Sequence, residues 1–438
     1  MTALLDPGAR LDAEGGWVRL HPLTPLLRGG RFLLVVLALV GQQGLREAPA
    51  GPLLALLGVT VPGAVLLGWL SWRAMRYRVT PTELQVESGV LTTRSRRVPL
   101  ARVQAVDVVR PFYARVLGLA ELRLEVVGGG SEAEAPLAFL AEEDAGRLRT
   151  RLLDLAAGRP ASEDDATPAP EPDVVLVTVP TGPLIWSTLL GFPLVSAVFF
   201  VLVVVVTALV DVRAVGPAIA TTVWILLGAG SFAVKRVLTE YGFTVAESPD
   251  GLRLRHGLLD TRTQTIPPGR VQAVRMSEPL LWRPFGWVRV EVDVAGYAGG
   301  SDQQTTTGAL LPVAPRTLAV ALVARVLGSA LPEADRPVPP AARWRAPLQA
   351  RRLRVGVDAR HVVSTSGVLT TTTDVAPLAK VQSLRTTAGP WQRRLGLASL
   401  HVDTAGRTLP GAVLPHRSSA DAGALLAEIG ELSRAARR

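Results

Sequence analysis

The sequence predicts a multi-domain membrane protein in which two transmembrane α-helical hairpins carry three copies of one small β-barrel or β-sheet domain, each closed by a C-terminal helix. Two observations lead to this fold class. Four long apolar runs interrupt the 438-residue chain, whose hydrophobic content of 48% and mean hydropathy of +0.30 are high for a soluble protein. One pattern of glycine, proline and glutamine also recurs three times along the chain without a gap.

The four apolar runs predict four membrane spans in two hairpins. They are Phe32–Leu45, extended backward through Arg31 to approach the ~20 residues of a span, Pro52–Trp72, Gly182–Val210 and Ala214–Val234. Short, nearly neutral segments connect the members of each pair, whereas the outer flanks are rich in Arg. The positive-inside bias therefore predicts a multi-pass protein of the cell membrane with both termini and every large segment in the cytoplasm. The first 30 residues show no signal-peptide pattern, so we expect the first hairpin to be the anchor.

The threefold repeat is carried by four positions in each copy. A glycine precedes a proline by ten residues and a glutamine by fifteen, and a second glycine follows that glutamine after fourteen. The positions are Gly89, Pro99, Gln104 and Gly118 in the first copy, Gly257, Pro267, Gln272 and Gly286 in the second, and Gly367, Pro377, Gln382 and Gly396 in the third. Agreement at so many positions without a gap indicates three homologous domains.

Local chemistry predicts strands and turns within each copy. The first glycine suits a hairpin turn that needs positive φ, and the proline suits the start of the next strand. Period-two alternation after the second glycine, as in Leu122, Leu124 and Val126, predicts a half-buried strand. Leucines at helical spacing in Ala141–Ala157 predict a closing helix, as do the patterns of Arg316–Leu327 and Asp421–Ala436.

These signals divide the chain into eight segments. They are a cytoplasmic N-terminal segment (1–25), the first hairpin (26–75), the first domain (76–158), an acidic Pro-rich linker (159–181), the second hairpin (182–236), the second domain (237–330), a Pro-rich linker (331–348) and the third domain (349–438). We expect residues 159–173 of the first linker to be disordered and the second linker to be an extended, semi-stiff spacer.

The repeated unit, G-[VL]-L-x7-P-x2-[RK]-V-Q followed by a Leu/Phe–Gly pair and a helix, resembles the bacterial pleckstrin-homology (PH-like) domain of the membrane-anchored type. The order of hairpin, domain, hairpin, domain, domain and the opening segment Trp17–Pro25 resemble one subgroup of that family. The resemblance covers nearly the whole chain. It implies a partly open PH-like barrel and a membrane-bound role, and it implies no catalytic activity or cofactor.

Several classes of chemistry find no support in the residues. There is no Cys, which excludes disulfides and thiolate catalysis, and the five His are too scattered for a metal site. No Gly-rich phosphate loop precedes a helix, and no charged residue lies inside the second or third span, as ion transport would require. We therefore expect no enzyme activity, no cofactor, no small-molecule substrate and no nucleic acid.

The leading hypothesis is a membrane-anchored scaffold, in envelope maintenance or stress tolerance, that contacts protein partners or associates with itself. Exposed strand edges would support such contacts by strand addition. The alternative is a lipid sensor, because Arg94, Arg96, Arg97 and Arg102 follow the first repeat glycine closely, where the resemblance places headgroup binding. At about 1 kcal/mol per basic residue, three would add about 3 kcal/mol toward an anionic surface. A solvated Arg-rich loop explains the same residues, and the third copy has Thr and Asp there.

Overall fold

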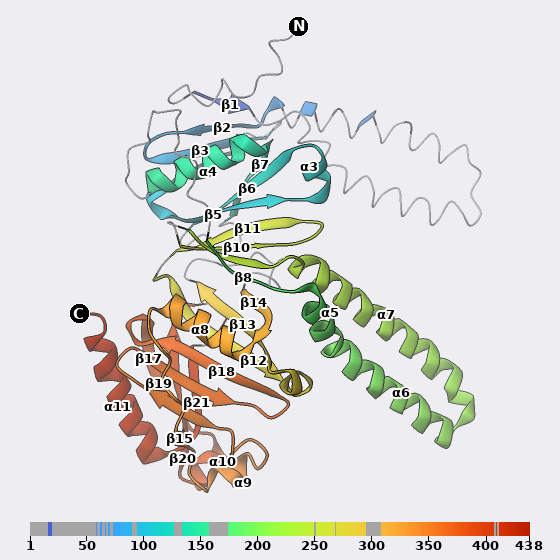
Figure 1. The fold of residues 1–438 in the computed structure, drawn as a ribbon, viewed down its shortest axis with the longest axis vertical. Coiled ribbons are helices and arrows are strands. Elements are labelled where there is room, and N and C mark those ends of the chain that lie inside the picture. The colour runs from blue at the N-terminus through green and yellow to red at the C-terminus, as the bar shows by residue number, and fades with distance from the viewer. Residues whose placement is uncertain are drawn as a thin grey trace. The chain divides into compact units, whose positions relative to one another are not determined.

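The computed structural model describes residues 16–19, 73–89, 94–126, 134–156, 174–248, 251–267, 269–294, 308–406 and 411–438, with isolated positions at 409 and between 58 and 70. Contacts divide the chain into two compact units, shown as ribbons in Figure 1. The first comprises Met1–Pro170 with Leu259–Gln264, and the second comprises Glu171–Leu258 with Thr265–Arg438. The first predicted hairpin and the acidic segment 159–173 lie outside the described residues.

The first unit contains the first repeat as two small antiparallel sheets and a closing helix. One sheet has the order β1-β2-β3-β4, and in the other β6 lies between β5 and β7. The elements are β1 (Val18–Arg19), β2 (Arg76–Val79), β3 (Glu83–Ser88), β4 (Arg94–Pro99), η2 (Leu100–Arg102), β5 (Val103–Arg110), α3 (Phe112–Val116), β6 (Leu119–Val126), β7 (Glu134–Ala141) and α4 (Glu142–Ala156). Leu148 and Leu152 of α4 are buried in one core with Leu122 and Leu124 of β6, as the predicted spacing requires.

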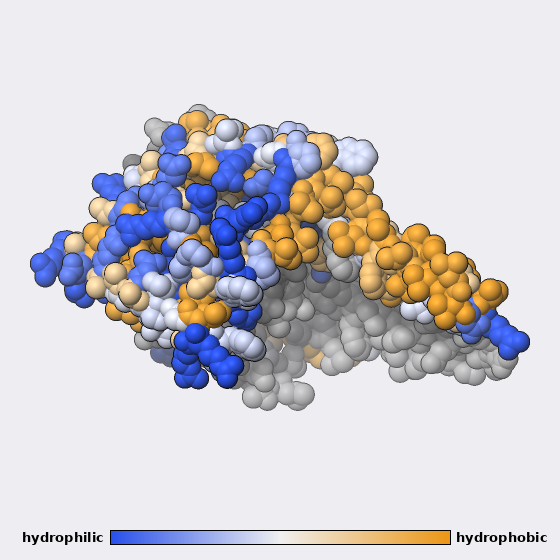
Figure 2. All heavy atoms as spheres, turned by 90° about the horizontal axis from the view of Figure 1, so that it is seen from below, coloured by the Kyte–Doolittle hydropathy of each residue, from blue (hydrophilic) through white to orange (hydrophobic). Residues whose placement is uncertain are grey.

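The second unit begins with a helical hairpin that carries two candidate spans. Its elements are β8 (Val174–Thr178), α5 (Thr181–Leu189), α6 (Phe192–Val210), η4 (Val212–Ala214) and α7 (Val215–Glu240). By length and composition, Thr181–Val210 and Val212–Glu240 are apolar enough to cross a membrane. Figure 2 shows apolar side chains over the visible face of the hairpin and a hydrophilic patch at its tip, where the connection holds Asp211 and Arg213.

The predicted span Gly182–Val210 lies within the candidate span Thr181–Val210, but a turn at Leu190 and Gly191 divides it into two helices. Gly191 is the N-cap of α6, and Pro193 follows in the first turn, where its missing N–H costs nothing. Helix α5 buries Leu184, Ser187 and Thr188. The 19 residues of α6 alone extend about 28 Å at ~1.5 Å per residue, close to the ~30 Å of a hydrocarbon core.

The second and third repeats, both in the second unit apart from Leu259–Gln264, follow the same order of strands, turn and helix as the first. The second has β9 (Thr244–Ser248), β10 (Gly251–His256), β11 (Thr261–Ile266), β12 (Val271–Pro279), η5 (Leu280–Phe285), β13 (Trp287–Val294), β14 (Ala309–Pro315) and α8 (Arg316–Leu327). The third has β16 (Arg354–Val357), β17 (His361–Ser366), β18 (Thr370–Pro377), η6 (Leu378–Lys380), β19 (Val381–Thr387), α10 (Pro390–Arg394), β20 (Leu397–Thr404), β21 (Ala412–Ser418) and α11 (Ser419–Ala435). The three closing helices lie within one or two residues of their predicted bounds.

The repeat glycines occupy backbone conformations that other residues rarely adopt. The first glycine of each copy has positive φ, at 118° for Gly89, 106° for Gly257 and 94° for Gly367. A Cβ at Gly367 would lie 1.9 Å from the carbonyl oxygen of Thr370. The turn therefore excludes a side chain on two grounds, positive φ and a backbone clash.

The second Pro-rich linker is only partly extended, and it is docked on the third domain, so it is no free spacer. Within it, β15 (Arg336–Pro337) pairs with β16, and α9 (Ala342–Arg345) follows. The buried guanidinium of Arg417 donates to the carbonyl oxygens of Arg336 and Pro337, both at 2.8 Å. Arg336 in turn makes two hydrogen bonds to Glu428 at 2.8 and 3.0 Å. An extended segment has backbone donors and acceptors that can pair with a neighbouring strand, here β16. Composition alone does not reveal such pairing.

Candidate functional site

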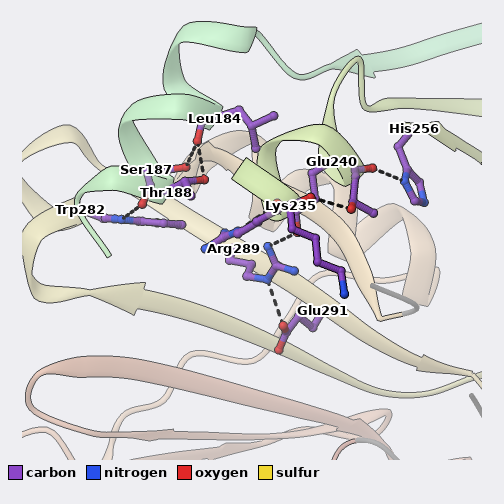
Figure 3. Close-up of polar contacts among 11 residues, drawn as sticks. Leu184, Ser187, Thr188, Lys235, Glu240, His256, Trp282, Arg289 and Glu291 are labelled. Atoms are coloured by element: carbon purple, nitrogen blue, oxygen red, sulfur yellow. Dashed lines mark hydrogen bonds and ion pairs between the residues drawn. The ribbon is translucent and has the colours of Figure 1, made fainter. Parts of the chain in front are cut away.

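The most strongly built polar site of the second unit lies where the apolar hairpin meets the second domain (Figure 3). At the end of α7, the carboxylate of Glu240 is 2% exposed and accepts from two arginines. Arg289 Nη1 lies 2.7 Å from Glu240 Oε1, and Arg236 Nε lies 3.2 Å from Oε2. Because Arg289 belongs to β13 and Arg236 to α7, one buried carboxylate joins the helix to the sheet.

The second acid at this site keeps Arg289 charged. Arg289 Nε lies 3.0 Å from Glu291 Oε1, and Glu291 is the next residue on the same face of β13. Burial alone would lower the pKa of Arg289, but the neighbouring carboxylates of Glu240 and Glu291 outweigh burial and raise that pKa overall. The group is therefore a permanent ion-pair partner, with no role as a proton donor near neutral pH.

A tryptophan fixes the other helix of the hairpin. Trp282 of η5 is 2% exposed, and its indole Nε1 donates to the Ser187 carbonyl oxygen of α5 at 3.0 Å. The guanidinium of Arg236 lies 5.9 Å from the centre of the same ring, within range of a cation–π contact. Trp282 is thus buried at this joint, whereas Trp391 of α10, which lies one repeat position earlier in the third copy, is exposed.

The end of α7 is also held from β10. The Nδ1 atom of His256 lies 2.8 Å from the Thr239 carbonyl oxygen, and its ring stacks on Phe243 with centroids 5.2 Å apart. His256 therefore serves the backbone at a helix end, where carbonyl groups lack helical partners. Among the residues that the structure describes, no group of three or more His, Asp or Glu side chains could hold a metal ion.

This arrangement can fix the orientation of the second domain relative to the hairpin, but its residues show no arrangement suited to catalysis. Its charged groups are paired, and its tryptophan N–H and histidine satisfy backbone carbonyls. Arg236 Nη2 is buried without a hydrogen-bond partner, but the ion pairs that hold Glu240 still favour one relative placement of the groups that they join. Within the second unit, the hairpin and the second domain are therefore fixed to each other at several points.

The predicted arginine cluster does not form one face. Arg94, Arg96 and Arg97 lie in β4 itself, and Arg102 ends the short helix η2. Successive strand residues point to opposite faces, so Arg96 lies on the face of the buried Val98 and Arg97 on the other, where its side chain is exposed. A headgroup would therefore meet the residues of one face only, a smaller charge than the sequence suggested. Lipid binding by this cluster stays a prediction.

Two joints between repeats are the feature that sequence reasoning missed. In the first unit, β5 of the first repeat pairs antiparallel with β11 of the second, and Asp107 Oδ2 lies 2.8 Å from Arg262 Nη2. In the second unit, β12 of the second repeat pairs with β18 of the third, and Arg275 Nε lies 2.6 Å from Asp374 Oδ1. The first two repeats thus use the strand after their proline to bind the strand before the proline of the next repeat.

The two ion pairs give the only hint of these joints that the sequence contained. Asp107 and Arg275 both lie three residues after the repeat glutamine, so one position of the repeat is charged with opposite sign in consecutive copies. Such a swap can indicate contact between copies.

Comparisons with known proteins agree with the repeat. A family model described as a bacterial PH domain matches residues 32–156, 190–330 and 308–433. The UPF0699 transmembrane protein YdbT of Bacillus subtilis (strain 168) is 24% identical over 283 residues, which cover 59% of this chain and 57% of that protein. The aligned region therefore spans little more than half of that relative, and no solved structure matches the chain. Three family matches over most of the chain, on domains that share one fold, show that this chain belongs to the bacterial PH domain family.

Proposed function

We propose that this protein is a membrane-anchored, non-enzymatic scaffold that presents three PH-like domains in the cytoplasm as binding surfaces. The observation that carries this proposal is the buried joint of Glu240, Arg289 and Trp282, which ties the apolar hairpin to the second domain. A protein whose anchor and domain need only be connected could use a flexible linker. A buried carboxylate paired with two arginines at the connection instead supports a role in which orientation at the membrane matters.

The strand-added joint between the second and third domains supports the same proposal. Six residue pairs join β12 to β18, and the Arg275–Asp374 ion pair lies within that ladder. The third domain is therefore carried at a defined angle to the second, and so to the hairpin. A fixed array of two domains at a membrane surface presents extended edges and faces to partners without the entropy loss of ordering a flexible chain.

The test is crosslinking in the native membrane, followed by purification with bound lipids and mass spectrometry. The expected result is a protein partner, or a second copy, crosslinked reproducibly at near-stoichiometric yield. Glu240→Gln, which loosens the anchor joint, should change the pattern of crosslinked sites, whereas Glu247→Gln on the surface of the same domain should not.

Two results would overturn the proposal. One is the absence of any reproducible protein crosslink. The other is selective enrichment of an anionic lipid that is lost when Arg94, Arg96 and Arg97 are replaced together by Glu, which would make headgroup recognition the function.

A further inference from the structure

The two joints between repeats share one register. In the first joint, Val108 faces Thr263, and these lie four residues after Gln104 and six after Gly257. In the second joint, Met276 faces Thr373, again four after Gln272 and six after Gly367. Equivalent residues therefore meet in both joints, although the side chains differ. A register kept through different sequences indicates that the edge strand of this domain is shaped to receive one particular alignment of a partner strand.

The third repeat has the same edge, and within the described residues nothing pairs with it. Strand β19 is the equivalent of β5 and β12, and it lies at the end of the three-stranded sheet β19-β20-β21. No residue of β12 is exposed, whereas five of the seven residues of β19 are exposed. An unpaired strand edge presents a row of backbone donors and acceptors.

Arg385 is the charged residue of this open edge. It lies three residues after Gln382, at the repeat position of Asp107 and Arg275, each of which forms an ion pair across its joint. Arg385 is 58% exposed and pairs instead with Asp403 of its own sheet, with Nε 3.0 Å from Oδ2. Its side chain thus carries the charge that the second joint uses, directed at a neighbour because no partner strand is there.

We propose that the β19 edge of the third domain is a docking site for an extended segment of a partner protein that carries a carboxylate opposite Arg385. The segment adds to β19 as an antiparallel strand in the register of the two internal joints. Its acidic residue takes the place that Asp374 holds against Arg275 in the second joint. This proposal rests on the scaffold function and names one of its binding surfaces and the chemistry of the occupant.

Charge argues for this occupant over a second copy of the chain. The strand of another copy that is equivalent to β11 and β18 is β4, and the shared register would place its Arg96 directly opposite Arg385. Arg97 would follow as the next residue along the same strand. Like charges directly opposite in an antiparallel pair are destabilising, and positively charged edges are a common device against edge-to-edge association.

The experiment uses the full-length protein in nanodiscs and a synthetic peptide with the sequence of residues 370–377, TTTTDVAP, which is the natural occupant of the equivalent β12 edge. A second peptide has Arg in place of its Asp. Hydrogen–deuterium exchange reports protection of the backbone amides of Val381–Thr387, and titration gives the two affinities. We expect protection of β19 and about tenfold tighter binding of the acidic peptide.

The matched variant is Arg385→Asp with Asp403→Arg, which keeps an ion pair within the sheet and reverses the charge at the edge. The preference between the two peptides should reverse in this variant. The proposal is overturned if neither peptide protects β19, or if the variant keeps the preference of the natural protein. Because the chain has no Cys, Thr386→Cys and Ser95→Cys can also be introduced. Disulfide-linked copies in membranes would assign the edge to a second copy and overturn the acidic-partner proposal.

Failure of this inference can be told apart from failure of the scaffold function. If the partners crosslinked in native membranes are unchanged in the Arg385→Asp/Asp403→Arg variant, the scaffold function stands and the β19 edge is not its docking site. If no partner is crosslinked to the natural protein at all, the scaffold function itself fails.

Discussion

Replacing Glu240 by Gln should loosen the second domain from the membrane hairpin. The carboxylate is almost fully buried and accepts hydrogen bonds from Arg289 and Arg236 through its two oxygens. Gln has nearly the same shape, but it has no charge and only one acceptor oxygen. The substitution therefore leaves two arginines facing each other with only Glu291, on the Arg289 side, as a nearby counter-charge.

The expected cost follows from burial of this pair. Breaking a buried ion pair by removing one partner costs about 3–5 kcal/mol, because the other charge stays buried without compensation. Gln keeps one hydrogen bond, so the lower end of that range applies. At ~1.4 kcal/mol for each factor of ten, about 3 kcal/mol corresponds to an increase of about a hundredfold in the equilibrium constant for opening of the joint.

Hydrogen–deuterium exchange in nanodiscs measures that opening directly. The peptides to follow are those that cover the end of α7 and the segment around Trp282, since both are held at the joint. Glu247→Gln is the matched control, because the Arg325–Glu247 pair of the same domain is about half exposed on both sides and should contribute at most about 1 kcal/mol. If Glu240→Gln raises exchange no more than the control, the joint does not depend on this carboxylate and our reasoning is wrong.

Three further predictions concern the domains. Asp374→Asn should weaken the joint between the second and third domains by about 1.5–3 kcal/mol, and a double-mutant cycle with Arg275 should show that the two residues are coupled. Gly367→Ala should lower the free energy of unfolding of the third domain by about 1–3 kcal/mol, whereas Gly269→Ala, which has positive φ but no neighbour within 4 Å, should cost less. Burial lowers the pKa of His361 below its usual 6.5, so as pH falls the unfolded chain binds a proton at this residue before the folded chain does. The contribution of His361 to stability is therefore present above about pH 6.5 and should be lost as pH falls through the folded-state pKa. His361→Asn should reduce this pH dependence of the free energy of unfolding, measured in urea titrations.

The repeat made much of the fold predictable. Three copies of one spacing located the turns, the alternating strands and the closing helices, because each signal is local and was seen three times. The glycines are the clearest case, since an equivalent positive φ recurs at Gly89, Gly257 and Gly367. Averaging over copies removed the ambiguity that a single short strand pattern has.

Features that depend on long-range packing could not be predicted in this way. The break between α5 and α6 falls inside an apolar run with no charge, and Pro193 was read as part of a span because hydropathy does not distinguish a helix start from a helix interior. Helix α5, unlike α6, is tied to the second domain, since Trp282 Nε1 donates to the Ser187 carbonyl oxygen. The Glu240 site was missed for a related reason, since Glu240 and Arg289 lie 49 residues apart in different elements.

The joints suggest why one position of the repeat has charges of different sign in different copies. Where an edge strand meets the next repeat, the residue three positions after the glutamine needs a partner in that repeat. The first two copies have opposite charges at this position, Asp107 and Arg275, and each forms an ion pair with the next copy. Because the charges differ, the strand that fits one edge is disfavoured at the other, and the domains are held in their order along the chain. Among the residues that the structure describes, no strand pairs with the equivalent edge of the third copy, yet Arg385 has the charge that the second joint uses. A positive charge also opposes association between identical edges, but that role alone does not require the repeat position that forms the ion pair in both joints. Retention of the residue that fits an acidic strand, in a register shared by both joints, is what a docking edge for a partner protein requires.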